Sequence, residues 1–238
     1  YVKSDDSYGS FNTYKYSAEI GSGKFWKDRF SVMGRYTKLH SDGYVDRAFS
    51  DLESYHLSVM FEENKTKLRL LVFGGKEKTY QAWNGIDKST YESHPKFNYS
   101  GAIYDANWEN IIGFYDNETD NYRQNHYHLL WEQKLGKIWN LETTFHLTHG
   151  EGYYENYKQD AKFSKYDLPN IVENGNTITR TDFIRKKWLD NDFYGVVSNL
   201  YGNFENVNLN FGVTANQYFG RHFGNVSGVK YTDIFEHE

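Results

Sequence analysis

The feature that most constrains this chain is an alternation of apolar and polar side chains in segments of about ten residues. In the clearest segment Val207, Leu209 and Phe211 are apolar, whereas Asn208 and Asn210 between them are polar. Successive side chains of a strand point to opposite faces of a sheet, so this alternation predicts strands with one apolar face and one polar face. Helices are not expected, because the apolar positions recur every second residue.

Eight segments of this kind divide residues 1–238, which we interpret as one structural unit. Both prolines, Pro95 and Pro169, fall between the segments, where a missing amide donor disturbs no strand pairing. We expect strands at about 11–21, 28–38, 51–62, 65–75, 123–134, 138–149, 191–204 and 207–220, with longer loops at about 39–50, 76–122 and 150–190.

The composition suits strands that are apolar on one side only. Hydrophobic residues make up 38% of the chain and the mean hydropathy is -0.83, whereas an ordinary globular domain is roughly 45–50% apolar. No stretch approaches the roughly 20 consecutive apolar residues of a membrane-spanning helix. If the chain crosses a membrane, it therefore does so with strands. Aromatic residues near the predicted strand ends have the composition of interfacial girdles: Tyr36, Tyr55, Trp131, Trp139 and Tyr194.

Charge and cysteine content exclude several classes of function. The formal net charge is -5 and no basic stripe is present, which argues against nucleic acid as a partner. The absence of cysteine excludes disulfides and thiolate chemistry. No nucleophile elbow, zinc-protease helix or phosphate loop occurs, so we expect neither an enzyme nor a bound cofactor.

The lengths of the connections alternate between short and long. Every short turn would then lie on one side of the sheet, as in the transmembrane β-barrels of bacterial outer membranes. Four short turns and three longer loops place both chain ends on the loop side. We therefore expect an all-β, antiparallel up-and-down transmembrane β-barrel, with about eight strands here belonging to a larger barrel whose apolar face contacts outer-membrane lipid.

Four stretches carry a family resemblance: Leu71–Gly85, Asp28–Arg35, Ser41–Tyr44 and Thr119–Tyr122. The sequences of these stretches resemble the barrel of TonB-dependent outer-membrane receptors from Bacteroidetes-type bacteria. The resemblance implies a 22-stranded barrel with an N-terminal plug that contacts the TonB complex. It also implies import of a small-molecule nutrient such as an iron complex (a siderophore), haem or cobalamin, with a surface lipoprotein as a possible partner. This chain contains neither the plug nor the TonB box, so we expect it to be a central barrel fragment.

The most specific polar group is His126 and His128 on one predicted strand with His146 on the next. A hairpin between these strands would place His128 roughly opposite His146 on the lumen face. Three imidazoles at such spacing can hold a transition metal or ligate haem iron. In the alternative interpretation they are hydrated lumen residues that hydrogen-bond to Glu132 or Glu142.

Aromatic residues of the two longest loops form a second candidate site, because flat amphipathic rings capture a large ligand at low entropic cost. They can equally pack the loops against one another. The candidate ligand-binding residues are Tyr80, Trp83, Tyr91, His94, Tyr153, Tyr154 and Tyr157. A third candidate group consists of cations that would face the lumen: Arg35, Lys67 and Arg69. They could steer an anionic ferric chelate, or they could be ordinary hydrated charges of a polar barrel lumen.

Two rival interpretations fit the same alternation. A soluble β-sandwich or jelly roll that binds carbohydrate would bury the apolar face against a second sheet. An outer-membrane enzyme would hold a nucleophile and a base within hydrogen-bond reach on its outer wall. The direction in which Leu209, Phe211 and Val213 point distinguishes the barrel from the sandwich.

Overall fold

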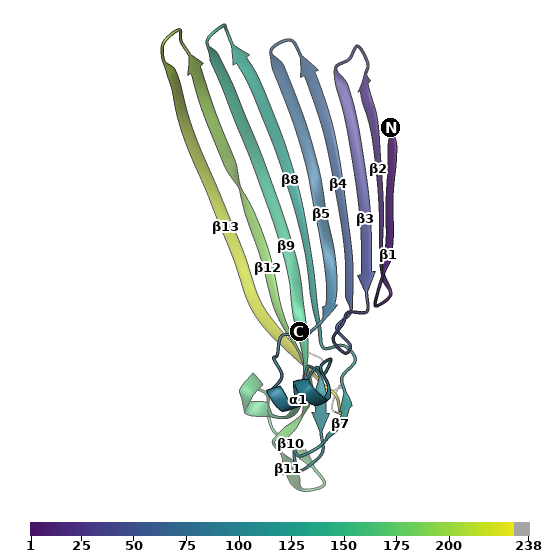
Figure 1. The fold of residues 1–238 in the computed structure, drawn as a ribbon. Coiled ribbons are helices and arrows are strands. Elements are labelled where there is room, and N and C mark those ends of the chain that lie inside the picture. The colour runs from purple at the N-terminus through teal and green to yellow at the C-terminus, as the bar shows by residue number, and fades with distance from the viewer. Residues whose placement is uncertain (231–238) are drawn as a thin grey trace.

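The computed structural model describes residues 1–230 and is built around one large antiparallel sheet (Figure 1). Its nine strands are ordered β1-β2-β3-β4-β5-β8-β9-β12-β13, which is their order along the chain. This arrangement confirms the predicted all-β, antiparallel up-and-down fold, with nine strands where about eight were expected. The strands are β1 (Val2–Gly9), β2 (Thr13–Phe25), β3 (Phe30–Ser41), β4 (Ser50–Glu63), β5 (Thr66–Tyr80), β8 (Thr119–Leu135), β9 (Trp139–Lys162), β12 (Arg180–Asn203) and β13 (Asn208–Gly228).

The connections gather at two opposite ends of the sheet, which we call the turn end and the loop end (Figure 1). The turn end holds the short connections 26–29, 64–65, 136–138 and 204–207. The loop end holds the connections 10–12, 42–49, 81–118 and 163–179. The longer loops contain α1 (Lys88–Ser93), β6 (Ala102–Tyr104), β7 (Ile111–Phe114), the short 3-10 helix Phe163–Tyr166, β10 (Ile171–Glu173) and β11 (Asn176–Ile178).

The strand register defines two faces. Residues directly opposite one another on paired strands lie on the same face, so Leu70 shares a face with Val59 and Leu129. Residues one position along lie on the other face. We call the first the apolar face, with Ile20, Val32, Leu57, Val59, Leu70, Tyr127, Leu129, Phe145, Val196 and Phe211. The second is the polar face, with Ser17, Arg35, His56, His126, His128, His146 and Asn216.

The apolar face is open. Leu129 is 41% exposed, Phe145 47% and Val213 66%, although all three lie within the large sheet. Among residues 1–230 the other sheets are the two-stranded pairs β6-β7 and β10-β11, and neither covers this face. The β-sandwich alternative, which requires a second sheet over these side chains, is therefore wrong for the described chain.

No helix within residues 1–230 has the length and apolar character needed to cross a membrane.

The structure corrects several predicted boundaries. Strand β1 was not predicted, and it places Tyr1 beside Gly21 on the wall, with the Tyr1 ammonium donating to the Gly21 carbonyl at 2.8 Å. The expectation that both chain ends lie at the loop end is thus wrong for the first residue. The expected loops 39–50, 76–122 and 150–190 shorten to 42–49, 81–118 and 163–179, because the flanking strands extend into them.

A small dry core forms at the loop end. Phe163 and Phe183 are fully buried, with ring centroids 5.8 Å apart. This loop core is completed by partly buried apolar residues from β9, the 163–179 loop and β13: Ala161, Tyr166, Leu168, Ile171, Ile178 and Val226. Packing on Phe183 and Val226, which lie on the polar face, folds the 163–179 loop over that face.

Candidate functional site

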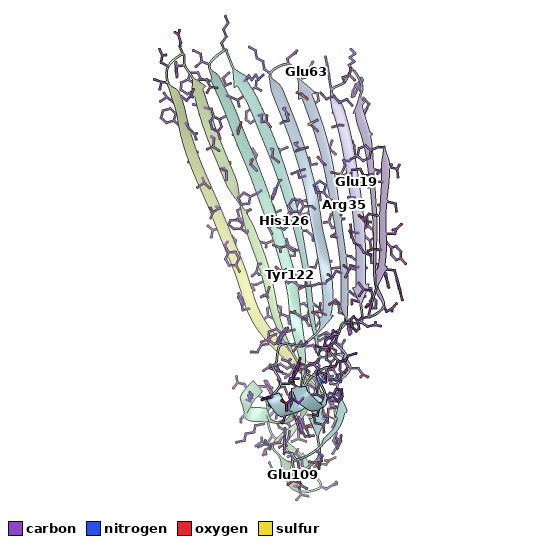
Figure 2. All side chains as sticks on the ribbon, viewed as in Figure 1. Glu19, Arg35, Glu63, Glu109, Tyr122 and His126 are labelled. Atoms are coloured by element: carbon purple, nitrogen blue, oxygen red, sulfur yellow. The ribbon has the colours of Figure 1, made fainter. Side chains whose placement is uncertain are left out.

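The three predicted histidines lie in the middle of the polar face, on β8 and β9. His128 pairs directly with His146, the register expected from the sequence, and their ring centroids are 6.4 Å apart. His126 lies 6.0 Å from His128, and its Nδ1 is 2.9 Å from the Thr148 hydroxyl. Figure 2 shows His126 about halfway along the wall.

Two phenylalanines extend the histidines into a band across the strands. The Phe73 ring stacks on His126 at 4.5 Å, and Phe193 lies 5.0 Å from His146. His56 continues the band onto β4, at 6.0 Å from Phe73. The imidazoles are therefore held by contacts with neighbouring rings, and the band offers a weakly polar strip on a mainly hydrophilic face.

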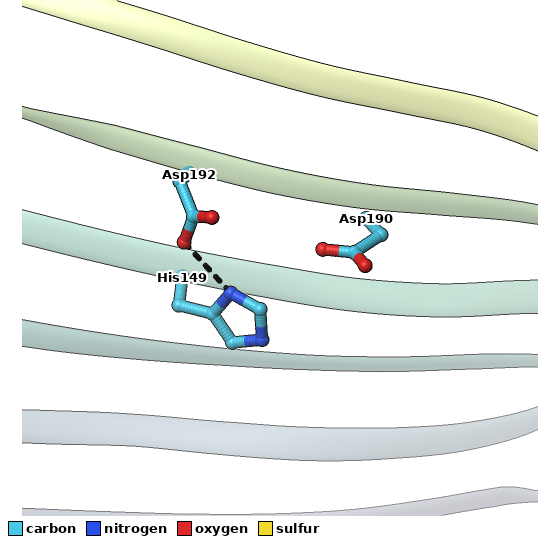
Figure 3. Close-up of side chains that lie close together, drawn as sticks. All are labelled: His149, Asp190 and Asp192. Carbon is cyan, nitrogen blue, oxygen red and sulfur yellow. Dashed lines mark hydrogen bonds and ion pairs between the residues drawn. The ribbon is translucent and has the colours of Figure 1, made fainter.

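Ligand atoms suited to a single metal ion converge elsewhere among the described residues. His149, Asp190 and Asp192 each offer one such atom within 4.8 Å of the others, and they lie on the apolar face near the loop end (Figure 3). These groups already have partners, because His149 Nδ1 lies 2.9 Å from Asp192 and Asp190 pairs with Arg221. The arrangement is that of a cross-strand ion-pair group.

A pocket of about 1090 Å³ lies at the loop end of the polar face. We call it the polar-face pocket. Its lining combines aromatic rings with charges of both signs: Tyr122, Tyr154, Tyr166, Lys165, Arg185, Lys187, Glu77, Asp120 and Asp167. Tyr122, one of the lining residues, is labelled on the sheet in Figure 2. Such a lining offers a ligand both charged groups and aromatic surfaces.

The cations of this pocket have few competing anions in contact. Arg185 donates from Nη2 to the Asn156 amide oxygen at 2.7 Å, and its Nε is buried without a hydrogen-bond partner. Lys187 is exposed, with its ammonium 5.7 Å from the centre of the Tyr154 ring. Both side chains therefore keep donors for a ligand.

A second pocket of about 460 Å³ shares Glu77 and Tyr122 with the first. Its further lining includes His56, Phe73 and His126. The two pockets therefore adjoin, and together they lead from the loop end along the polar face to the histidine band.

The predicted loop aromatics do not gather into one site. Tyr80 is 4% exposed and donates to the carbonyls of Ser100 and Tyr115, so it anchors the loop rather than facing a ligand. Trp83 and Tyr91 are both 60% exposed. His94 is exposed and pairs with Asp46 at 3.2 Å.

The other three predicted aromatics belong to β9, not to a loop. Tyr153 lies on the apolar face, where its ring contacts Trp188 at 4.3 Å. Tyr154 lies on the polar face, lines the pocket and contacts Trp83 at 5.6 Å. Tyr157 donates to Asp182 at 2.5 Å and stacks on Tyr115. Of the seven candidates, Tyr153 and Tyr154 line the polar-face pocket.

Buried polar groups join the 81–118 loop to β9. Asn156 donates to Glu118 at 2.8 Å, and the Tyr157 amide donates to the same carboxylate at 2.8 Å. Burial raises the pKa of Glu118 above its ordinary value. Burial and the neighbouring Glu155 carboxylate also raise the pKa of Tyr115, which donates to Glu155. These bonds position the loop beside the polar-face pocket.

The predicted steering cations lie away from this pocket. Lys67 is near the turn end and pairs with Glu132 at 2.9 Å, and Arg35 donates to Ser17 at 3.2 Å. Arg69 is on the same part of β5. Lys165, Arg185 and Lys187 are the pocket cations, and they were missed because their segment, 150–190, carries no apolar alternation and was interpreted as loop.

No protein-family model and no curated protein sequence matches this chain. Solved structures do match it. The chain is similar to the ferric preacinetobactin receptor BauA from Acinetobacter baumannii, with a TM-score of 0.56, 11% identity and coverage of 98% of this chain and 31% of that one. It is also similar to the siderophore receptor PiuA from A. baumannii, with a TM-score of 0.60, 12% identity and coverage of 98% and 33%.

A third match is the ferric-catecholate import receptor Fiu from Escherichia coli K12, with a TM-score of 0.56, 13% identity and coverage of 95% and 32%. The chain thus spans about a third of the length of these structures. At such identities the likeness establishes the fold, which is that of a part of the barrel of TonB-dependent siderophore receptors. The resemblance suggested by the sequence is confirmed at that level.

Proposed function

We propose that this chain forms part of the wall of an outer-membrane TonB-dependent receptor that binds and imports an iron chelate. The matched structures are receptors, which supports a receptor rather than an enzyme. The open apolar face supports contact with membrane lipid, since the outward face of an outer-membrane barrel is apolar where it meets hydrocarbon. Contacts with the TonB complex through a plug, and with a surface lipoprotein, belong to the same proposal.

The observation that carries the ligand assignment is the polar-face pocket. Arg185 and Lys187 bring two cations, and Tyr122, Tyr154 and Tyr166 bring aromatic rings, to one pocket of about 1090 Å³ beside the loops. A ferric catecholate is an anion with flat rings, so Arg185 and Lys187 would contact its charge and the tyrosines its rings. The adjoining pocket then offers a route toward the histidine band.

The test is the binding of an iron tris-catecholate complex to the whole chain in detergent micelles. Binding is measured by the quenching of tryptophan fluorescence. Arg185→Gln/Lys187→Gln should weaken binding about tenfold, which corresponds to ~1.4 kcal/mol. Lys67→Gln/Arg69→Gln is the matched control, because it removes the same two charges at the same spacing from the same face, near the turn end. Equal losses in both variants, or no loss in the first, would contradict the assignment.

The histidine band supports a second ligand class within the same proposal. His126 lines the pocket that adjoins the polar-face pocket, and His128 and His146 lie beside it in the same band, where an imported haem or metal chelate would contact them. Haem added to the chain should show a shifted Soret band that is lost in His128→Ala/His146→Ala. An unchanged spectrum in the variant would remove haem from the proposal and leave the catecholate assignment standing.

A further inference from the structure

A row of charged side chains crosses the apolar face near the loop end. Each member is directly opposite the next across the strand pairs from β3 to β13. The row consists of Lys38, Glu53, Lys76, Arg123, Glu151, Asp190 and Arg221. Between this row and the turn end, the same face carries mainly apolar and aromatic side chains.

The apolar part of this face is about as tall as the hydrocarbon layer of an outer membrane. On β5 the face runs from Thr66 through Leu68, Leu70 and Val72 to Lys76, which is ten residue steps. At about 3.3 Å per residue this is ~33 Å along the strand, and a strand tilt of roughly 40° reduces it to ~25 Å. An apolar band of ~25 Å is typical of outer-membrane barrels, so the charged row would lie at the lipid headgroups.

Two cations are adjacent within the row. Lys76 and Arg123 are directly opposite each other on β5 and β8, an arrangement in which like charges repel. Each has one carboxylate on its outer side: Lys76 lies 3.2 Å from Glu53, and Arg123 pairs with Glu151. Their side chains remain 61% and 57% exposed. An ammonium has three donors and a guanidinium five, so both keep donors for an anion placed between them.

Pockets adjoin this cation pair on two sides. One of about 400 Å³ lies toward the loops, and one of about 190 Å³ lies toward the apolar band. Lys76 and Arg123 line both. The smaller one is also lined by Tyr36 and Tyr55, and the Tyr55 hydroxyl reaches across to Asn125 at 2.8 Å. The pair therefore has an aromatic floor on its membrane side and open space on its loop side.

We propose that Lys76 and Arg123 bind the phosphate of a lipid headgroup in the leaflet next to the loops. The inference rests on the membrane location in the proposed function, and it is independent of the imported ligand. A guanidinium and an ammonium side by side suit a phosphate, because the planar fork binds two of its oxygens and the ammonium a third. The acyl chains would follow the tyrosines onto the apolar band, where the exposed side chains of Leu57 and Leu70 lie.

The test compares lipid retention by the whole chain in detergent micelles, measured by native mass spectrometry. The probes are dioleoyl phosphatidic acid and dioleoylglycerol, which differ only in the phosphate. Phosphatidic acid should be retained about tenfold better by the unchanged chain, and Lys76→Gln/Arg123→Gln should bring it to the level of dioleoylglycerol. Lys24→Gln/Arg29→Gln removes the same charges at the turn end and should leave the preference intact.

Three outcomes would overturn the inference. They are no phosphate preference in the unchanged chain, equal losses in the two variants, and displacement of phosphatidic acid by an equal concentration of inorganic phosphate, which would indicate a site for the free ion. Circular dichroism of each variant establishes that the sheet is retained. Failure of iron-catecholate binding with an intact phosphate preference would instead count against the proposed import function alone.

Discussion

Apolar side chains are exposed in the large sheet, which forms the wall of the molecule, and buried at the loop end. In the wall, Phe211 is 58% exposed and Val213 66%, whereas in the loop core Phe163 and Phe183 are fully buried. The loop end thus folds as water-soluble proteins do, by removing apolar surface from water. The wall is held together by its strand ladders and leaves its apolar surface for another partner, for which we propose lipid.

The buried polar residues of the described chain follow the same division. Most lie where the loops meet the strands, including Gln81, Asn98, Glu118, Glu155 and Asn156. Gln81 donates to the carbonyls of Thr119 and Glu155, and Asn98 donates to those of Asp46 and Gln81. Such bonds specify one loop conformation, since a buried polar group without a partner costs free energy. The loop end is therefore where single substitutions should act most strongly in water.

The largest effect is expected from a cavity in the loop core. Phe183→Ala should lower the free energy of unfolding by about 3–5 kcal/mol, because the side chain is fully buried against Phe163 and Tyr166. Phe211→Ala is the matched control on the wall and should cost less than ~1 kcal/mol in detergent, where micelle and solvent replace the lost contacts. Guanidinium unfolding measures both. Similar losses would mean that the wall carries a dry core of its own.

The second prediction reverses the comparison by adding a bilayer. Leu129 lies on the apolar face between Leu70 and Phe145, and Leu130 lies on the polar face between Arg69 and Thr144. In phospholipid vesicles Leu129→Lys should cost about 2–4 kcal/mol and Leu130→Lys about 1 kcal/mol or less, because a lysine in hydrocarbon loses its hydration.

Unfolding of the two lysine variants in vesicles and in detergent provides the measurement. In water the more exposed Leu129 would be the more tolerant of the two positions. A larger cost at Leu130 in vesicles would show that the apolar face does not contact lipid.

The third prediction compares a glycine from each region. Gly101 in the 81–118 loop has φ +74°, and a Cβ there would lie 2.4 Å from the Tyr80 hydroxyl and 2.8 Å from the Tyr115 carbonyl oxygen. Gly136 at the turn end has φ +80° but open space around a Cβ. Gly101→Ala should therefore cost about 2–3 kcal/mol, and Gly136→Ala about 1 kcal/mol, which is the conformational part alone. Equal melting-temperature shifts would mean that Tyr80 moves aside at no cost.

The sequence predicted the strands well where one face is apolar and poorly elsewhere. Strands β3 and β4 were placed within two or three residues, because Phe30, Val32, Leu57 and Val59 alternate with polar neighbours. Strand β1, with the sequence VKSDDSYG, is exposed throughout and has no apolar periodicity to detect. Beyond the charged row both faces of β9 and β12 are mainly polar or aromatic, so their extensions resembled loops.

The candidate site was predictable only in its local pairings. The register of His128 with His146 followed from the hairpin, since the turn at Gly136 fixes which residues are opposite. The polar-face pocket combines β5, β8, β9, β12, β13 and the 163–179 loop, which are distant in sequence, so no local pattern indicates it. Likewise, nothing in the sequence distinguishes the buried Tyr80 from the exposed Trp83 nearby.

The smallest effect is expected from pH. It should act where buried polar groups join the 81–118 loop to β9, which we call the loop junction, and not at exposed loop positions. Burial raises the pKa of Glu118 in the folded state, so the folded chain holds this proton more tightly than the unfolded chain does. Stability from this group is thus fully present below the ordinary glutamate pKa and is lost as the pH rises through the folded-state value. The protection factor of the Tyr157 amide, which donates to Glu118, should decrease between pH 4 and pH 8.

Glu118→Gln should flatten that profile, and Glu109→Gln, at an exposed loop position, should leave it unchanged (Figure 2). An identical profile in the Glu118 variant would assign the pH dependence to another group, and the junction would then differ from the wall in packing alone.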